Sequence, residues 1–330
     1  MKYIVMSGDS HTCGQGATSF YIQDEPTLGY EPMGKGVGRN TDYATRCYVN
    51  LVREAIVRRT QSEAFEVTAS DLAHAGHLPM VNRCAHLTRP LELPVGSDGL
   101  LVCFAEKKEA ARVEILVDGV CVRTETLQAD ITRYGDWSFR YIPVDCTGAA
   151  SVTFRPLEGD VYLYTMEMCS GRWAVVNSGV GSCPVGRYLK DYFDDCVAAF
   201  RPDIVVLEAH TINDWIHSPT PQDYARDLTD MIRRVRQIGA TPVLLTVSPI
   251  LGEQQINGHA PYEEYIAASL EVARLENVRI ADAHALMARR LEGKSEEEKK
   301  QDLFDDIWHV NDAGHKIYCD VVMSSIAALL

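Results

Sequence analysis

The sequence predicts an α/β fold in which helices cover both faces of a five-stranded parallel sheet, in three layers, with an antiparallel β-sandwich inserted into that domain. Near the start of the chain and beyond residue 169, short apolar runs alternate with amphipathic helical segments. Between residues 62 and 168, short β-rich runs follow one another without helices. We therefore expect residues 1–61 and 169–330 to form one discontinuous domain, with residues 62–168 as the insert.

The elements of the larger domain follow from these periodicities. Strands are expected at residues 3–7, 173–176, 203–207, 242–247 and 278–281. Helices with apolar side chains at three- and four-residue spacing are expected at residues 42–59, 184–200, 221–238, 261–275, 284–291 and 312–330. Thr41 is suited to cap the first helix and Gly239 to end the third. Residues 13–40 are rich in Gly and Pro, which predicts a long loop over the mouth of a site. The charged run at residues 294–300 is expected on the surface.

The insert is expected to be antiparallel throughout, because turn residues separate its strands at short intervals. The strand-like runs lie at residues 64–68, 100–104, 113–117, 138–142, 151–154 and 161–164. Asp118-Gly119 follows one of these runs and is a signal for a type I′ hairpin, since both residue types tolerate a positive φ.

Composition and charge limit the classes of partner. The 330 residues contain 46 Asp and Glu against 32 Lys and Arg, a formal net charge of −14. This balance argues against nucleic acid or an anionic membrane surface as a partner and favours a neutral or weakly charged ligand. The first residues lack the apolar core of a signal peptide and no stretch reaches the length of a membrane span, which favours a cytoplasmic location. The ten cysteines show neither a C-x-x-C pair nor zinc spacing, so we expect no disulfide framework, no metal and no cofactor.

The stretch Gly8-Asp9-Ser10 comes directly after the first apolar run. A hydroxyl at this point would lie at the carboxyl end of a buried strand, where open α/β sheets bind their ligands. Ser10 is therefore a candidate nucleophile. Gly, Asp and Ser are also common turn formers, so the tripeptide alone leaves an ordinary turn open.

Three further segments follow strands or precede the last helix, and they would meet Ser10 at the same edge of the sheet. These segments are residues 177–183 (NSGVGSC), 210–214 (HTIND) and 305–315 (DDIWHVNDAGH).

With these four segments in order, the chain resembles the SGNH hydrolase superfamily, the GDSL-type esterases and lipases. Gly8-Asp9-Ser10 resembles the first block of the family, residues 177–182 the second, Asn213-Asp214 the third and Asp306-Ile307-Trp308-His309 the fifth. The resemblance covers the two outer parts of the chain but not the insert. It implies a flavodoxin-like sheet and a serine esterase, and the lack of a G-x-S-x-G elbow in the sequence disfavours an ordinary α/β-hydrolase.

The chemistry of acyl transfer gives the matched residues roles. A serine hydroxyl is a poor nucleophile near neutral pH, so a base must take its proton, and His309 is the candidate base. Asp306 is the candidate group that orients the imidazole and stabilises its charged form. Asp305 offers the same chemistry, and only the three-residue spacing to His309, which matches the family, favours Asp306.

The resemblance also implies three donors for an oxyanion hole: the backbone N–H of Ser10, a backbone N–H of the second block, and the side-chain amide of Asn213. The second donor belongs to either Gly181 or Ser182. Ser182 stands where family members usually have glycine, so it can supply the donor only if its backbone adopts the required turn. His210 also stands where a plainer residue is common.

Other polar residues near these motifs have structural interpretations. Asp9 and Asp214 are expected to be hydrogen-bonding members of turns, and His315 a structural residue of the last helix. His11 either lines the site or lies on the surface. Three histidines of the insert lack carboxylate or thiolate partners at metal spacing and are expected to be scattered on the surface: His74, His77 and His86.

We expect an esterase that removes acetyl groups from a carbohydrate or small glycoside through an acyl-enzyme on Ser10. A lipase or thioesterase acting on longer acyl chains, and a non-catalytic glycan-binding protein, are the alternatives. The insert is expected to bind carbohydrate or to mediate homo-oligomerisation. Its aromatic residues either stack on sugars or fill the sandwich core: Tyr134, Trp137, Tyr141, Tyr162 and Tyr164.

Overall fold

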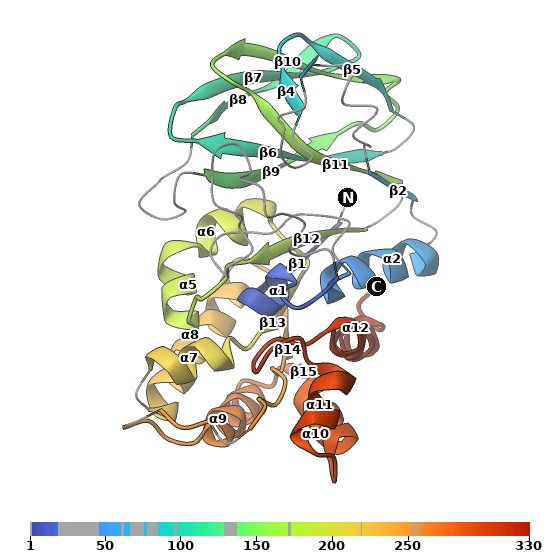
Figure 1. The fold of residues 1–330 in the computed structure, drawn as a ribbon. Coiled ribbons are helices and arrows are strands. Elements are labelled where there is room, and N and C mark those ends of the chain that lie inside the picture. The colour runs from blue at the N-terminus through green and yellow to red at the C-terminus, as the bar shows by residue number, and fades with distance from the viewer. Residues whose placement is uncertain are drawn as a thin grey trace.

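A computed structural model describes residues 2–18, 46–60, 63–66, 76–77, 85–95, 98–128, 137–170, 173–218, 220–252, 254–256 and 258–330. A five-stranded parallel sheet lies in one part of the molecule and two antiparallel sheets lie in the other (Figure 1). Most of the loop predicted at residues 13–40, and the predicted cap Thr41, fall outside the described residues. None of the described helices is long and apolar enough to cross a bilayer.

The parallel sheet has the strand order β12-β1-β13-β14-β15, and every neighbouring pair is parallel. Its strands are β1 (Lys2–Gly8), β12 (Trp173–Gly179), β13 (Ile204–Glu208), β14 (Thr241–Leu245) and β15 (Arg279–Ala281). Within this sheet the chain order is 2-1-3-4-5, the flavodoxin-like order that the resemblance implied. The predicted α/β fold with five parallel strands is therefore confirmed.

Helices cover both faces of this sheet, because successive side chains of its strands enter different cores. In β1, Val5 packs in one hydrophobic cluster, while Ile4 and Met6 pack in the other. The cluster of Val5 is completed by α5 (Val185–Asp191), α6 (Phe193–Cys196), α7 (Thr211–His217), α8 (Pro221–Gln237) and α9 (Tyr262–Leu275). The cluster of Ile4 and Met6 is completed by α2 (Tyr48–Thr60), α10 (Ala283–Leu291), α11 (Glu296–Leu303) and α12 (Asp312–Ile326).

Some helical segments differ from the prediction. The helix predicted at residues 184–200 is interrupted at Tyr192, which leaves the helical conformation (φ −126°) while its ring stays buried beside Tyr188. Helices α7 and α11 were not predicted. The charged run of α11 is mostly exposed, as expected, but it is helical because Ser295 and Glu298 form a capping box at its start.

Two antiparallel sheets follow α2 in the chain and precede β12. One has the order β5-β10-β7-β8, and the other has the order β3-β4-β11-β6-β9, with β2 paired to β11. The strands are β2 (Glu63–Glu66), β3 (Gly76–His77), β4 (Ala85–Leu87), β5 (Leu91–Pro94), β6 (Gly99–Lys107), β7 (Ala111–Val117), β8 (Val120–Leu127), β9 (Trp137–Asp145), β10 (Ser151–Glu158) and β11 (Tyr162–Ser170). The described residues of this block form strands and turns without a helix, as predicted, although β3, β4, β5 and β8 were not expected individually.

Strand β6 is buried on both faces and joins the two parts of the molecule. Phe104 of β6 meets Phe154 of β10 edge to face, with ring centroids 5.7 Å apart, in a cluster that side chains of both antiparallel sheets line. Leu101 and Cys103 point to the opposite face, as the two-residue period of a strand requires, and join the cluster of Val5. The antiparallel block therefore shares a core with the α/β part.

The predicted hairpin at Asp118-Gly119 is present. Both residues have positive φ, 47° and 77°, and they connect the paired residues Val117 and Val120. Positive φ at both central positions defines a type I′ turn, so this prediction is confirmed.

Candidate active site

Ser10 begins a short helix, α1 (Ser10–Cys13), immediately after β1, so it lies at the carboxyl edge of the parallel sheet. Close packing requires a glycine just before this turn. A Cβ on Gly8 would lie 2.0 Å from Oγ1 of Thr12 and 2.3 Å from Oε2 of Glu208. The strand end and the helix start therefore fix the position of Ser10.

The first and last motifs of the chain meet at this point. Oγ of Ser10 lies 2.9 Å from Nε2 of His309, 299 residues further along the chain. Nδ1 of His309 in turn lies 2.7 Å from Oδ2 of Asp306. A hydroxyl, an imidazole and a carboxylate in this order can pass the hydroxyl proton to the ring while the carboxylate holds the other ring nitrogen.

Asp306 is held by its own turn as well as by the imidazole. Its Oδ1 accepts the backbone N–H groups of Trp308 and His309, each over 2.8 Å. Burial acts to raise the pKa of this carboxyl, but the hydrogen bond and charge of His309 and the two backbone donors lower it, and the net pKa lies below the usual range. Asp305 is exposed and bonds the carbonyl of His309 through its backbone N–H, over 2.9 Å. The geometry therefore selects Asp306 rather than Asp305 as the partner of the ring.

Asn213 lies in the first turn of α7, which follows β13, and it reaches the turn that carries Ser10. Its Nδ2 donates to Oδ2 of Asp9 over 2.6 Å. Oδ1 of Asp9 accepts the backbone N–H of His11 over 3.1 Å, so Asp9 is the hydrogen-bonding turn residue that we expected. Because an amide nitrogen carries two N–H groups, the contact with Asp9 leaves Asn213 a second donor.

Gly181 and Ser182 form the turn after β12, and Ser182 has a φ of 53°. This left-handed conformation is one that glycine adopts without strain and serine does not. Ser182 thus takes the turn conformation at the position where the resemblance led us to expect glycine. The turn approaches α1 closely, because a Cβ on the preceding Gly179 would lie 2.3 Å from the backbone N of Cys13.

Two buried side chains join this turn to the segment of Asn213. Nδ1 of His210 lies 2.7 Å from the carbonyl oxygen of Cys183, and burial lowers the pKa of this imidazole. Oδ2 of Asp214 accepts the backbone N–H of Val185 over 2.8 Å, as expected of a hydrogen-bonding residue, and burial raises its pKa to about 8. The second and third motifs are therefore fixed relative to one another.

Glu208 ends β13 and is fully buried, and it was not predicted as a residue of the site. Its Oε2 accepts the backbone N–H of Asp9 over 2.8 Å and the hydroxyl of Thr12 over 2.9 Å. Burial and the charge of Asp9 raise the pKa of Glu208 to about 8. In the sequence, the signal for Glu208 was an acidic residue at the end of an otherwise apolar strand. His11 lies beside this group with 1% of its surface exposed, which excludes a surface position.

Other histidines lie in the last helix and in the antiparallel block. His315 is fully buried in α12, as predicted. In the antiparallel block, His77 and His86 are paired residues of β3 and β4, and Nε2 of His86 lies 3.3 Å from a carboxylate oxygen of Asp160. His74 lies outside the described residues. Among the described residues, side chains of metal-ligating types come together in Asp9, His11 and Glu208, whose ligand atoms lie within 4.8 Å of one another.

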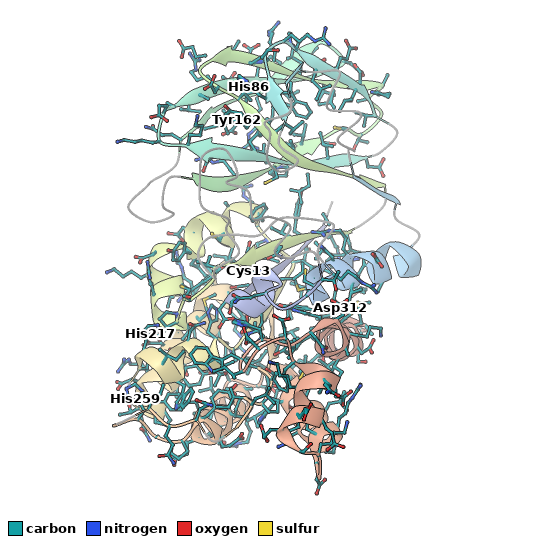
Figure 2. The ribbon with its side chains drawn as sticks, viewed as in Figure 1. Cys13, His86, Tyr162, His217, His259 and Asp312 are labelled. Carbon is teal, nitrogen blue, oxygen red and sulfur yellow. The ribbon has the colours of Figure 1, made fainter. Side chains whose placement is uncertain are left out.

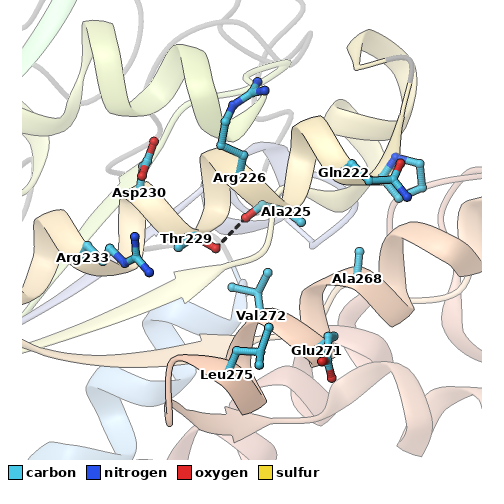
Figure 3. A pocket seen from close by; sticks show the side chains of 11 residues that line it. Gln222, Ala225, Arg226, Thr229, Asp230, Arg233, Ala268, Glu271, Val272 and Leu275 are labelled. Atoms are coloured by element: carbon cyan, nitrogen blue, oxygen red, sulfur yellow. Dashed lines mark hydrogen bonds between the residues drawn. The ribbon is translucent and has the colours of Figure 1, made fainter.

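Two other features involve none of the residues of the four motifs. Figure 2 shows His86 and Tyr162 in the antiparallel part, whereas Cys13, at the end of the helix that Ser10 begins, lies in the α/β part. Figure 3 shows a shallow groove between α8 and α9, lined by side chains such as Ala225, Val272 and Leu275. None of the residues that line this groove belongs to the four motifs.

Comparison with known proteins places this site in a class. Residues 162–317 match the GDSL-like Lipase/Acylhydrolase family, a region that contains the second, third and fifth motifs but not Ser10. No curated protein is significantly similar to the chain in sequence.

Several solved structures are similar to the chain. A peptidoglycan O-acetylesterase is 15% identical over 100% of this chain and 91% of its own, with a TM-score of 0.54. LAE5, an alpha/beta hydrolase enzyme from the metagenome of Lake Arreo in Spain, is 13% identical over 100% of this chain and 96% of its own, with a TM-score of 0.49. Axe2, an acetylxylan esterase from Geobacillus stearothermophilus, is 21% identical over 47% of this chain and 72% of its own, with a TM-score of 0.39.

The family match supports a class for the protein. Residues 162–317, just under half of the chain, are similar to GDSL-like acylhydrolases, and this similarity supports a hydrolase of the SGNH type with esterase or acylhydrolase activity.

Proposed function

We propose that the protein is a serine esterase that hydrolyses its substrate through an acyl-enzyme on Ser10. The observation that carries this proposal is the chain of contacts from Oγ of Ser10 to His309 at 2.9 Å and from His309 to Asp306 at 2.7 Å. Oγ attacks the ester carbonyl carbon while Nε2 of His309 takes the hydroxyl proton. The imidazolium then gives this proton to the departing alcohol as the ester C–O bond breaks. Water, activated by the same ring, releases the acid and restores Ser10.

Three donors stabilise the oxyanion of the tetrahedral intermediate in this proposal. The backbone N–H of Ser10 belongs to the first turn of α1, where amide donors have no partner within the helix. The second donor is the backbone N–H of Gly181 or Ser182. The third is the second N–H of Asn213, whose amide the Asp9 contact holds in place. Each donor of this kind is worth about 3 to 4 kcal/mol in a measured serine protease.

For the substrate we propose an O-acetylated carbohydrate or small glycoside. The similarity of fold, over the whole chain, to a peptidoglycan O-acetylesterase supports this choice. The net charge of −14 also favours a neutral ligand over a polyanion. The second candidate is a lipase or thioesterase that acts on longer acyl chains, and the GDSL-like Lipase/Acylhydrolase match favours it equally.

We propose that residues 62–168 form a β-sandwich inserted into a domain made of residues 1–61 and 169–330. The edge-to-face contact of Phe104 and Phe154, one from each antiparallel sheet, supports a common sandwich core. We assign the insert to glycan binding or to homo-oligomerisation. Among the aromatic candidates, Tyr162 has a described side chain. Its ring stacks on His86, with centroids 4.8 Å apart, and Nζ of Lys107 lies 5.3 Å from the ring centroid.

Turnover of p-nitrophenyl acetate tests the role of Ser10. Ser10→Ala should abolish turnover and labelling by a fluorophosphonate probe, with the fold unchanged by circular dichroism. Ser7→Ala is the matched control. Ser7 is a fully buried serine of β1 whose Oγ has no hydrogen-bond partner among the described residues, so its loss should leave turnover intact. Retention of most of the turnover by Ser10→Ala would end the proposal. A purified protein that neither turns over nor labels would favour a non-catalytic glycan-binding protein.

The acyl group and the alcohol are tested separately. Rates on acetylated sugars are compared with rates on aryl esters of two to twelve carbons. The proposal predicts preference for acetyl esters and release of acetate from acetylated oligosaccharides. A clear preference for chains of about eight carbons or more would favour the lipase or thioesterase.

A further inference from the structure

His11 has both ring nitrogens next to oxygen atoms. Nδ1 lies 3.2 Å from Oδ1 of Asp9, and Nε2 lies 3.0 Å from the backbone carbonyl oxygen of Trp308. A carbonyl oxygen can only accept, and a neutral imidazole has one N–H and one acceptor nitrogen. A neutral His11 would therefore leave a lone pair facing an acceptor at one of the two contacts. Both contacts are hydrogen bonds only if both nitrogens carry protons.

The carboxylate of Asp9 is ionised, because donors surround it. Its two oxygens accept the N–H of His11, the ring of His11 and the amide of Asn213. Burial acts to raise the pKa of Asp9, but the hydrogen bonds and charge of His11 lower it well below the usual range. Asp9 and His11 therefore form an ion pair with no more than 1% of either side chain exposed.

His315 provides an internal comparison, since it is also fully buried and also makes two contacts. Its Nδ1 accepts the backbone N–H of Tyr48 over 3.3 Å, and its Nε2 lies 3.2 Å from the carbonyl oxygen of Gln15. One donor and one acceptor suit a neutral ring. The pKa values of the two rings are shifted in the directions that these contacts favour. Burial lowers that of His315 to about 3, whereas at His11 the hydrogen bond and charge of Asp9 overcome burial and raise it to about 9.

Other ionisable groups face His11 from each neighbouring element. Oε1 of Glu208, on β13, lies 4.0 Å from Nδ1 and has no hydrogen-bond partner among the described residues. The ring of His309 lies 5.3 Å away between centroids, and that of Tyr318, on α12, lies 5.9 Å away. Burial and the charge of Asp9 raise the pKa of Glu208 to about 8, which opposes a second negative charge beside Asp9.

The contacts of His11 span the machinery of the proposed reaction. Trp308, whose carbonyl it bonds, lies between Asp306 and His309 in the turn that carries the base. Asp9, its other partner, precedes the nucleophile and holds the amide of Asn213. One ring therefore connects the nucleophile turn, the oxyanion amide and the loop of the base.

We propose that His11 is a positioning residue that acts as an imidazolium at neutral pH, tying the loop of His309 to the carboxylate that holds Asn213. This inference rests on the proposed function, in that it assigns His11 to the alignment of that reaction. A neutral ring would lose one of the two contacts, and the loop of His309 or the Asp9 carboxylate would lose its anchor.

The charge of His11 is measured by nitrogen NMR of histidine-labelled protein near neutral pH. We expect His11 to show two protonated ring nitrogens and His315 to show one, with His11 assigned by its loss in the His11→Gln variant. A neutral His11 would overturn the proposal. The same spectrum tests metal binding by Asp9, His11 and Glu208, since a metal on His11 would replace a ring proton. The charge is read from the wild-type protein, the variant serves only for assignment, and the result is independent of turnover.

The positioning role is measured with the same substitution at the two histidines. A glutamine at position 315 can accept from Tyr48 and donate to Gln15, so His315→Gln should leave kcat within about twofold. A glutamine at position 11 has a single amide group to meet two acceptors. We expect His11→Gln to lower kcat by about 100-fold, the effect of displacing a reacting group by about 1 Å, with KM changed less than about threefold.

The two proposals fail in different ways. A His11→Gln variant that keeps the kcat of the wild type would refute the positioning role and leave the esterase proposal untouched. Turnover that survives in Ser10→Ala would refute the esterase proposal, whatever the charge of His11.

Discussion

Oδ2 of Asp9 accepts a hydrogen bond from Nδ2 of Asn213 over 2.6 Å, which joins the residue before Ser10 to a helix that begins some 200 residues later. Because Asp9 also pairs with His11, the amide is held by a carboxylate that is itself fixed. A donor held in this way needs no reorganisation when negative charge develops, and that is what makes an oxyanion hole effective.

Asn213→Ala should therefore lower kcat by about 10²- to 10³-fold, the cost of removing one such donor in a serine protease, and change KM little. Steady-state rates on p-nitrophenyl acetate measure it. A variant with a raised KM and an unchanged kcat would show that Asn213 binds substrate and does not stabilise the intermediate.

Asp306→Asn should lower kcat by up to about 10⁴-fold, as in the serine-protease case, because an amide can hold the wrong tautomer of the ring. The substitution keeps an oxygen for the N–H groups of Trp308 and His309, so the turn should persist. Asp305→Asn is the control, since Asp305 meets His309 through its backbone alone in the contacts that the structure gives. Equal losses in the two variants would contradict the assignment.

Ser182→Gly should keep kcat and raise the free energy of unfolding by about 1 kcal/mol, because glycine relieves the strain of a left-handed φ of 53°. Arg201→Gly is a matched control, since Arg201 has a φ of 47° at the end of a 3₁₀ turn. Urea unfolding and steady-state kinetics measure the two quantities. Loss of activity in Ser182→Gly would show that the hydroxyl has a role beyond that of the backbone.

Stability should fall as pH rises from about 7 to about 9. The pKa values of His11, Glu208 and Asp214 are raised to about 9, 8 and 8, so the folded state binds more protons than the unfolded chain in this window. Each contribution is complete below the unfolded pKa and is lost as pH passes the folded one, at up to about 1.4 kcal/mol per pH unit and group.

Asp214→Asn keeps an oxygen for the N–H of Val185 and removes one of these groups, so the slope of stability against pH should become shallower. Urea unfolding at pH 7, 8 and 9 measures both slopes. Identical slopes in the variant and the wild type would mean that Asp214 does not titrate in this range.

Sequence analysis placed Ser10 and His309 at the same edge of the sheet, because one motif follows the first strand and the other precedes the last helix, and the two side chains do meet there. The sequence was also sufficient to predict the hairpin at Asp118-Gly119, where local chemistry decides the backbone. The S-x-x-E pattern of Ser295 and Glu298 also indicates a capping box. From the charge of this run, however, we predicted only that it is exposed, and not that it is helical.

Other features depend on packing that no local pattern encodes. The helix of Asn213 starts at His210, which has a left-handed φ of 54° and makes no side-chain cap, so the usual start signal is missing. The charge of His11 depends on Asp9 and on a carbonyl 297 residues away. Glu208 carried one signal in the sequence, its place at the end of an apolar strand, but its contact with the turn of Ser10 depends on the pairing of β13 with β1.

The most direct measurement of the central claim is the mass of the enzyme quenched with acid during turnover of p-nitrophenyl acetate. We expect one added acetyl group, located by peptide mapping on Ser10 and missing from Ser10→Ala. An acetyl group on another residue, or full turnover with no acyl-enzyme in either protein, would contradict it.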